Sequence, residues 1–150
     1  MTPITALQLL ANLIKEFEGL SLKAYKCPAG IWTVGYGATG KGINKDTVWT
    51  QHQADEQLHD RALEALHDAI NASPILLHET IERQAAIADF VYNCGIGNYR
   101  TSTLKKRVDA GDWKSAQHEI LKWDKATING NIVALKGLSK RRKIESEMLI

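Results

Sequence analysis

The first part of the chain carries apolar residues at the spacing of a helix that buries one face. They stand three or four residues apart, at Ile4, Leu7, Leu10, Ala11, Ile14 and Phe17. Thr2 followed by Pro3 is typical of an N-cap with proline at the first helical position, and Gly19 is a natural stop. The pattern predicts a helix over residues 3–18.

The next segment, residues 20–45, has the composition of short strands and turns. Glycines recur through it, and strand-forming residues such as Trp32, Thr33 and Val34 stand between them. This predicts a small β-hairpin or meander. Strands this short and this few are not stable alone, so we expect them to pack against a helix.

The rest of the chain has helical patterns. One long helix is predicted from about residue 47 or 50 to 72, where Ser73-Pro74 ends it. Another covers residues 79–93. Ser102 caps a further helix that stops at Gly111, and Asp112 caps the one after it.

The last helix is expected to begin at Ser139, after a turn in the stretch "TINGN". The second half of the chain is thus predicted to be entirely helical. The fold class is α+β, with one domain over residues 1–150, a β-rich lobe at about 19–46 and a helical lobe at about 74–150.

Charge is distributed unevenly along the 150 residues, whose net charge is +2. Residues 1–75 hold 6 basic and 8 acidic side chains, a net −2, and residues 76–150 hold 13 basic and 9 acidic ones, a net +4. A mildly basic half suits an anionic partner such as cell wall, outer-membrane lipid or nucleic acid. It is equally typical of a solvated helical surface.

Cysteine and histidine usage gives no indication of a metal or a cofactor. Cys27 and Cys94 are the only cysteines; neither belongs to a C-x-x-C pair, and we expect Cys94 to be a buried free thiol.

The N-terminus lacks the charged and apolar regions of a signal peptide, and no run of about 18 apolar residues occurs. We therefore expect a protein that is made and folded in the cytoplasm.

Glu18 is the first candidate for chemistry. It lies in the last turn of the first predicted helix, where the negative end of the macrodipole disfavours a charged carboxylate, so its proton should be held more tightly. A glutamate there, beside a cleft between lobes, is a candidate general acid. The alternative is an ordinary exposed glutamate.

Cys27 and Thr33 are the next candidates, on the predicted hairpin. "CPAG" is a plausible β-turn with Cys27 first, which would hold the thiol on a stiff corner where it acts as a base or nucleophile once it is a thiolate. The hydroxyl of Thr33 could hold a water between Glu18 and Cys27. Alternatively, Cys27 is an inert small apolar residue and Thr33 an ordinary strand residue.

Taken together, these residues form the pattern Glu-x8-Cys-x5-Thr, followed by "GYG". The sequence here resembles the phage-type lysozymes, the endolysins that cut bacterial peptidoglycan. The resemblance covers nearly the whole chain, in the blocks "FEGLSLKAY", "CPAGIWTVGYGATG", "FVYNCGIGNYRTSTL", "GDWKSA", "KW" and "GLSKRRKIESEML". It implies a lysozyme-like fold, with an active-site cleft between a small β-hairpin lobe and a helical lobe that a long helix joins.

The same resemblance implies a muramidase that hydrolyses the β-1,4 bond between N-acetylmuramic acid and N-acetylglucosamine. Glu18 matches the proton donor, and Thr33 matches the residue that helps to place the attacking water. Cys27 stands where many members carry aspartate. As a thiolate it would either act as general base on water or attack the sugar to give a covalent intermediate, with opposite anomeric products.

Other positions are expected to support this site. A basic residue of the last helix, Arg141 or Arg142, is expected to pair with Glu18, although a solvated basic face is an equal alternative. Tyr92, Asn93 and Arg142 are the predicted substrate-binding residues. Asn93 could bind an acetamido group, and a helix C-cap before Cys94-Gly95 is an equal alternative. Ala38 stands where the family often has histidine. Trp32, Trp113 and Trp123 could stack on sugars but are expected to be core residues.

The predicted partner is the glycan strand of peptidoglycan, bound by a monomer that does not bind nucleic acid. The basic last helix, with Ile144, Met148 and Leu149, could also bind anionic outer-membrane lipid as an amphipathic segment. A wall-binding or membrane-binding module without hydrolysis is the competing function. The resemblance further implies that the enzyme stays in the cytoplasm until a pore made by another protein lets it reach the wall.

Overall fold

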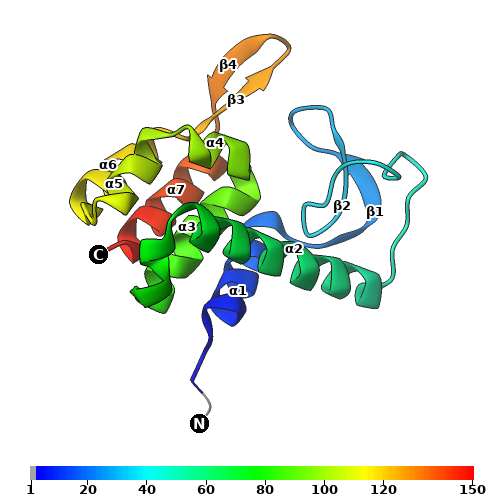
Figure 1. Cartoon of the computed structure of the whole chain (residues 1–150). Coiled ribbons are helices and arrows are strands. Elements are labelled where there is room, and N and C mark those ends of the chain that lie inside the picture. The colour runs from blue at the N-terminus through cyan, green and yellow to red at the C-terminus, as the bar shows by residue number, and fades with distance from the viewer. Residues whose placement is uncertain (1–2) are drawn as a thin grey trace.

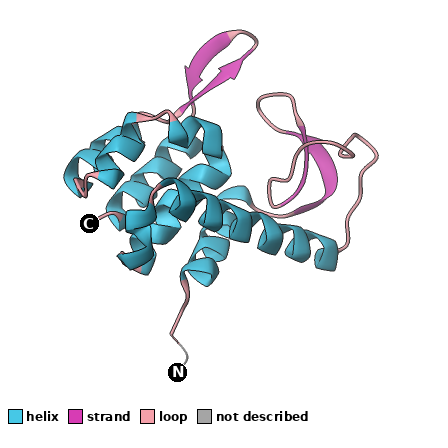
Figure 2. Cartoon of the chain, viewed as in Figure 1, coloured by secondary structure: helices cyan, strands magenta, loops and turns pink. Residues whose placement is uncertain are grey.

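A computed structural model describes residues 3–150, which form seven α-helices, one short 3₁₀ helix and four strands. In chain order they are α1 (Ala6–Glu18), β1 (Ser21–Lys26), β2 (Trp32–Gly35), α2 (Gln51–Ala72), η1 (Pro74–His78), α3 (Ile81–Cys94), α4 (Ile96–Arg100), α5 (Thr103–Asp109), α6 (Trp113–Leu121), β3 (Lys125–Ile128), β4 (Asn131–Ala134) and α7 (Lys136–Met148). The β1–β2 hairpin lies beside a body of helices, and α2 runs from one to the other (Figures 1 and 2). The predicted α+β class is confirmed.

Helices α1 and α2 each begin with a capping box. The Thr5 hydroxyl accepts the Gln8 N–H, and the Gln8 side chain accepts the Thr5 N–H in return. Because this box starts α1 at Ala6, the predicted start at residue 3 is wrong; Thr2, the predicted N-cap, lies outside the described residues. Thr50 and Gln53 form the same box at the start of α2.

The β1–β2 hairpin has the predicted turn. Its strands are antiparallel, with Tyr25 opposite Thr33, and the Gly30 N–H donates to the Cys27 carbonyl over 2.8 Å. Gly30 has a φ of +80°, a conformation that glycine adopts without strain. The hairpin packs against α2, as the shortness of its strands led us to expect.

Helix α3 lies at the centre of the helical body, in contact with α1, α2 and α7. Every residue from Ala85 to Val91 is buried. Most of them are small or apolar, but Asp89 is charged and fully buried, so it needs partners inside the protein.

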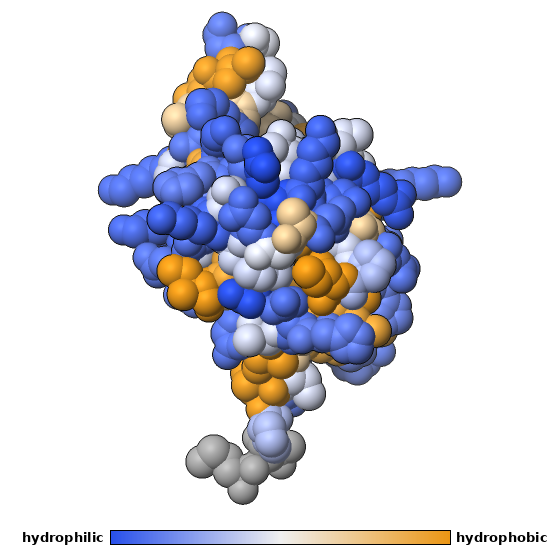
Figure 3. Space-filling model, turned by 60° about the vertical axis from the view of Figure 1, so that its left-hand side comes forward, coloured by the Kyte–Doolittle hydropathy of each residue, from blue (hydrophilic) through white to orange (hydrophobic). Residues whose placement is uncertain are grey.

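The second half of the chain is not entirely helical, and that prediction is wrong. Strands β3 and β4 form an antiparallel hairpin in which Ala126 faces Val133 and Thr127 faces Ile132. Asn129 and Gly130 form its turn with φ values of +51° and +80°, and Asn-Gly is the preferred pair for such a turn. The hairpin stands out from the body (Figures 1 and 3). Ile132, in β4 close to the turn, is exposed.

Helix α7 begins at Lys136 rather than at the predicted Ser139, whose hydroxyl instead donates to Asp124. Its apolar side chains, Ile144 and Met148, pack against the core, and Leu149, just after the helix, is fully buried within it. The apolar face predicted for membrane binding is therefore not free. Within residues 3–150, no helix has the length and apolarity required to cross a bilayer.

Candidate active site

A cleft of about 830 Å³ lies between the β1–β2 hairpin and the helical body. The three residues predicted to carry the chemistry, Glu18, Cys27 and Thr33, all line it. They come from the end of α1, the hairpin turn and β2. The opposite wall comes from the end of α3, the β3–β4 hairpin and α7.

The Glu18 carboxylate is one-fifth exposed and lies at the junction of three segments. One of its oxygens, Oε1, accepts a hydrogen bond from Nη1 of Arg141. The other, Oε2, lies so close to Gly37 that a β-carbon at that position would overlap with it. Gly37 also has a φ of +82°, so both backbone conformation and space require glycine there.

Arg141 is the basic residue that pairs with Glu18, which answers the question the sequence left open between Arg141 and Arg142. Its side chain is 4% exposed. Its Nε and Nη2 donate to the two Asp89 oxygens over 2.8 and 2.7 Å, and its guanidinium lies 5.1 Å from the centre of the Phe17 ring. Such a fork-to-fork pair is geometrically specific.

Arg142, predicted to bind substrate, is fully buried and is not among the residues that line the cleft. On a helix, consecutive residues point in directions about 100° apart, so Arg142 leaves α7 in a different direction from Arg141, which reaches Glu18. Arg142 donates to Asn93 Oδ1 over 2.6 Å and to the Cys94 sulfur over 2.7 Å. It therefore contacts the cleft wall from behind.

Tyr92 and Asn93 both line the cleft. The Tyr92 hydroxyl donates to the Tyr36 carbonyl over 3.0 Å, so it ties α3 to the loop that holds Gly37. Burial, with the nearby Glu18 charge, raises the pKa of Tyr92 to about 12, which keeps this hydroxyl protonated.

The two cysteines are both free and both partly exposed to the cleft. Burial raises the pKa of the Cys94 thiol, an effect that outweighs the nearby Arg142 charge. Cys94 is therefore the free thiol that we predicted, although it is not fully enclosed. On the hairpin, the Thr33 hydroxyl donates to the Ile31 carbonyl over 2.9 Å, which leaves its oxygen able to accept a further hydrogen bond.

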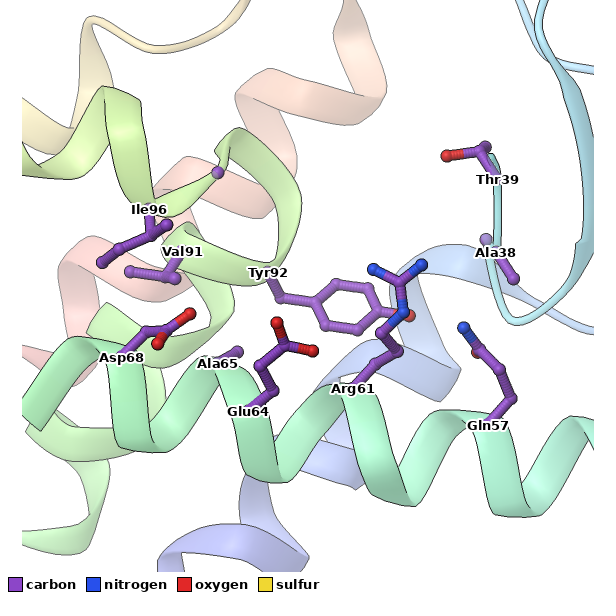
Figure 4. A pocket seen from close by; sticks show the side chains of 12 residues that line it. Ala38, Thr39, Gln57, Arg61, Glu64, Ala65, Asp68, Val91, Tyr92 and Ile96 are labelled. Carbon is purple, nitrogen blue, oxygen red and sulfur yellow. The ribbon is translucent and has the colours of Figure 1, made fainter. Parts of the chain in front are cut away.

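A second, smaller cavity of about 220 Å³ lies above one face of α2 (Figure 4). Arg61, Glu64 and Asp68 point into it, and Tyr92 and Gly37 belong to both cavities. Ala38, which departs from the family's usual histidine, is buried at its edge. Neither Glu18 nor Cys27 lines this cavity, so the larger cleft is the candidate active site.

Sequence reasoning missed Asp89 and Gly37. Asp89 could have been noticed as the single charge within the otherwise apolar run "AAIADFVY" of the predicted helix. Trp113 and Trp123 pack against the core as predicted, and Trp123 also reaches the cleft. Trp32 is only partly buried on β2, where Lys26 lies over its ring, and it does not pack against the core, so the prediction for Trp32 is wrong. In the described part of the chain, no group of three side chains is placed to hold a metal ion.

The family model described as phage lysozyme matches residues 15–145. The chain belongs to the phage lysozyme family. Its sequence is 41% identical over 136 residues to the endolysin of Acyrthosiphon pisum secondary endosymbiont phage 1, with 91% of each chain covered.

Solved structures agree with this assignment. An endolysin from Escherichia coli O157:H7 phage FAHEc1 superposes with a TM-score of 0.83 at 29% identity, covering 100% of this chain and 94% of that one. The muramidase domain of SpmX from Asticaccaulis excentricus gives 0.80 at 29% identity, covering 95% of each. The predicted lysozyme-like fold and the function of a glycosidase and peptidoglycan-hydrolysing endolysin are confirmed.

A cluster of buried charged side chains lies behind Glu18. Its members are Asp89, Arg141, Arg142 and Glu145. Glu145 is fully buried; its Oε1 lies 3.0 Å from Nε of Arg142, and its Oε2 lies 4.0 Å from Nε of Arg141. Burial raises the pKa of Glu145 well above its usual range, and the neighbouring Asp89 raises it further. Burial alone would raise the pKa of Asp89 too, but hydrogen bonds from Glu145 and Arg141 and the arginine charges hold it below its usual range.

Replacing Gly37 by alanine tests the close approach to Glu18. Gly37→Ala should displace the carboxylate and lower kcat by about 10²-fold, the effect of misplacing a reacting group by about 1 Å. The matched control is Gly42→Ala, because Gly42 has a similar φ of +86° and open space around it. Both variants should lose about 1–2 kcal/mol of stability from the backbone strain. Equal activity in the two would contradict the steric role of Gly37.

Replacing Glu145 by glutamine tests its protonation. Above pH 4.5 an unfolded glutamate releases a proton that the folded protein keeps, so this residue's contribution to the free energy of unfolding falls as the pH rises towards its folded pKa. Glutamine is neutral in both states. Thermal and urea unfolding should therefore show Glu145→Gln gaining stability relative to wild type as the pH rises above 4.5. The exposed Glu147→Gln is the control; a difference independent of pH would show that Glu145 is ionised.

Proposed function

We propose that this phage lysozyme is a muramidase that cleaves the β-1,4 bond between N-acetylmuramic acid and N-acetylglucosamine, with Glu18 as general acid. The observation that carries the proposal is that Glu18, Cys27 and Thr33 line one cleft, at the spacing typical of the family. The likeness to a muramidase domain supports the choice of bond. The chain over residues 1–150 would act as one catalytic domain.

In the proposed reaction, Glu18 gives its proton to the glycosidic oxygen as the bond from that oxygen to C1 breaks. A water attacks C1 from the other side and gives a proton to the Cys27 thiolate. Thr33 supports this route, because its own hydroxyl proton is bound to the Ile31 carbonyl and its oxygen can accept a hydrogen bond from that water. Of the two roles considered for Cys27, we therefore propose the general base.

Substrate binding would use the amide of Asn93. Arg142 can only donate, so Oδ1 of Asn93 faces Arg142 and its amide nitrogen is left to donate to the carbonyl of an acetamido group. Arg142 would then act on the substrate through Asn93. Tyr92 would contribute its ring, since its hydroxyl is used by the Tyr36 carbonyl.

The proposed partner is the glycan strand of the cell wall, bound by a monomer that does not bind nucleic acid. We do not extend the proposal to outer-membrane lipid, because Arg141 and Arg142 are buried and the apolar residues of α7 pack against the core. The enzyme would reach the wall after release from the cytoplasm through a pore made by another protein.

The general acid is tested by zymography in a peptidoglycan gel. Glu18→Gln should abolish the clearing zone, since general acid catalysis contributes about 10²–10⁴-fold. The control is Glu16→Gln, an exposed residue of the same helix, which should clear like wild type. Clearing by Glu18→Gln would point to a membrane-disrupting or binding module instead.

The bond that is cut is identified by mass spectrometry of the digest. A reducing N-acetylmuramic end is expected. An anhydro end would indicate a lytic transglycosylase, and freed peptides would indicate an amidase or peptidase, so either product contradicts the proposal.

The role of Cys27 is tested by two substitutions and one spectrum. Cys27→Ser should lose about 10²-fold or more in kcat, because serine is a poor base at neutral pH, and Cys27→Asp should retain activity. With water as the attacking group, NMR of the fresh digest should show the α-anomer first. If the β-anomer forms first, Cys27 attacks the sugar and the general-base role is wrong.

A further inference from the structure

Asp89 is a fully buried carboxylate to which the proposed reaction assigns no task. It lies on α3, does not line the cleft, and both of its oxygens accept hydrogen bonds from the guanidinium of Arg141. Burying a charge is unfavourable, and a buried ion pair is weak evidence for stability, because apolar replacements are often neutral or stabilising. Its position therefore calls for an explanation other than packing.

The geometry around Arg141 supplies an explanation for the buried Asp89. A guanidinium is planar and rigid, so fixing two of its nitrogens fixes the third. Asp89 holds Nε and Nη2 at 2.8 and 2.7 Å, while Phe17 packs against the face of the group at 5.1 Å. The remaining nitrogen, Nη1, then points at the Glu18 carboxylate.

We infer that Asp89 is a positioning residue, which sets the place of the Glu18 carboxylate in the cleft by fixing Arg141. The inference rests on the proposed function, since it assumes that Glu18 is the general acid. Gly37 limits the carboxylate from the opposite side, so Glu18 is held between a donor fixed by Asp89 and a backbone that leaves no spare room.

The charges of the cluster favour Asp89 over Glu145 for this task. Two carboxyl groups, Asp89 and Glu145, lie near the two buried guanidiniums of Arg141 and Arg142. Asp89 makes two aligned hydrogen bonds to Arg141, whereas the nearest Glu145 oxygen is 4.0 Å from it. Neither Glu145 oxygen accepts an aligned hydrogen bond. A neutral amide should therefore replace Glu145 without changing the contact to Glu18.

The experiment compares Asp89→Asn with Glu145→Gln in steady-state kinetics on soluble glycan fragments. In Asp89→Asn the new amide N–H₂ faces an arginine N–H, so Arg141 should turn away from Glu18. We expect kcat to fall by about 10²-fold, as for a misplaced reacting group, with KM within about 2-fold of wild type. Glu145→Gln should keep both constants within about 2-fold of wild type.

A double mutant shows whether Asp89 acts through Arg141. If it does, adding Asp89→Asn to Arg141→Gln should lower kcat no further than Arg141→Gln alone. If the double mutant instead shows the product of the two single losses in kcat, the two residues act independently and the inference is overturned. A folded Asp89→Asn variant with wild-type kcat would also overturn it.

If Asp89→Asn does not fold, Arg141→Lys provides the test. Lysine keeps the charge but cannot hold the Asp89 fork and Glu18 together, so kcat should again fall with little change in KM. A folded Arg141→Lys with wild-type kcat would overturn the inference. Glu18→Gln distinguishes a failure of this inference from a failure of the proposed function. If Glu18→Gln is inactive while Asp89→Asn is fully active, only the inference about Asp89 fails. If Glu18→Gln is itself active, the proposed function fails.

Discussion

The ion pair between Glu18 and Arg141 is the contact on which the cleft depends. It joins the last residue of α1 to the second turn of α7, and through Asp89 it also reaches α3. Three helices thus meet at one guanidinium. Because that group is planar, the direction of the Glu18 carboxylate follows from how these helices pack rather than from the free rotation of one exposed side chain.

This arrangement is possible because the surroundings offset the burial of charge. Each arginine has an aromatic ring beside it, Phe17 for Arg141 and Phe90 for Arg142, at 5.1 and 5.2 Å. Each also has polar partners for its N–H groups. Small residues of α3, such as Ala85 and Ala88, are fully buried and let neighbouring helices approach closely. The helical body therefore encloses two arginine charges that an apolar core of ordinary composition would exclude.

Local signals in the sequence were enough for most elements of the fold. The caps at Thr50, Ser102 and Asp112 and the turn at Cys27 were all predictable, because each depends on residues within a few positions of one another. The β3–β4 hairpin also had a local signal in Asn129-Gly130, but its strands are only four residues long and their alternation is weak.

The roles of the buried charges could not be predicted in the same way. Whether Arg141 or Arg142 faces Glu18 depends on the rotation of α7 about its axis, which packing against α3 and α6 decides. Asp89 likewise has no local reason to be charged, since its partner lies 52 residues later. The family resemblance supplied Glu18, Cys27 and Thr33 as a set, but not the residues behind them.

Glu18 and Arg141 are separated by 123 positions in the chain. Protein synthesis delivers the glutamate long before the arginine, so a growing polypeptide that has not yet reached α7 has the carboxylate without the group that orients it. The same is true of any fragment that stops short of α7. On the role proposed for Glu18, activity would therefore appear only after α7 has been synthesised and has packed against α1 and α3.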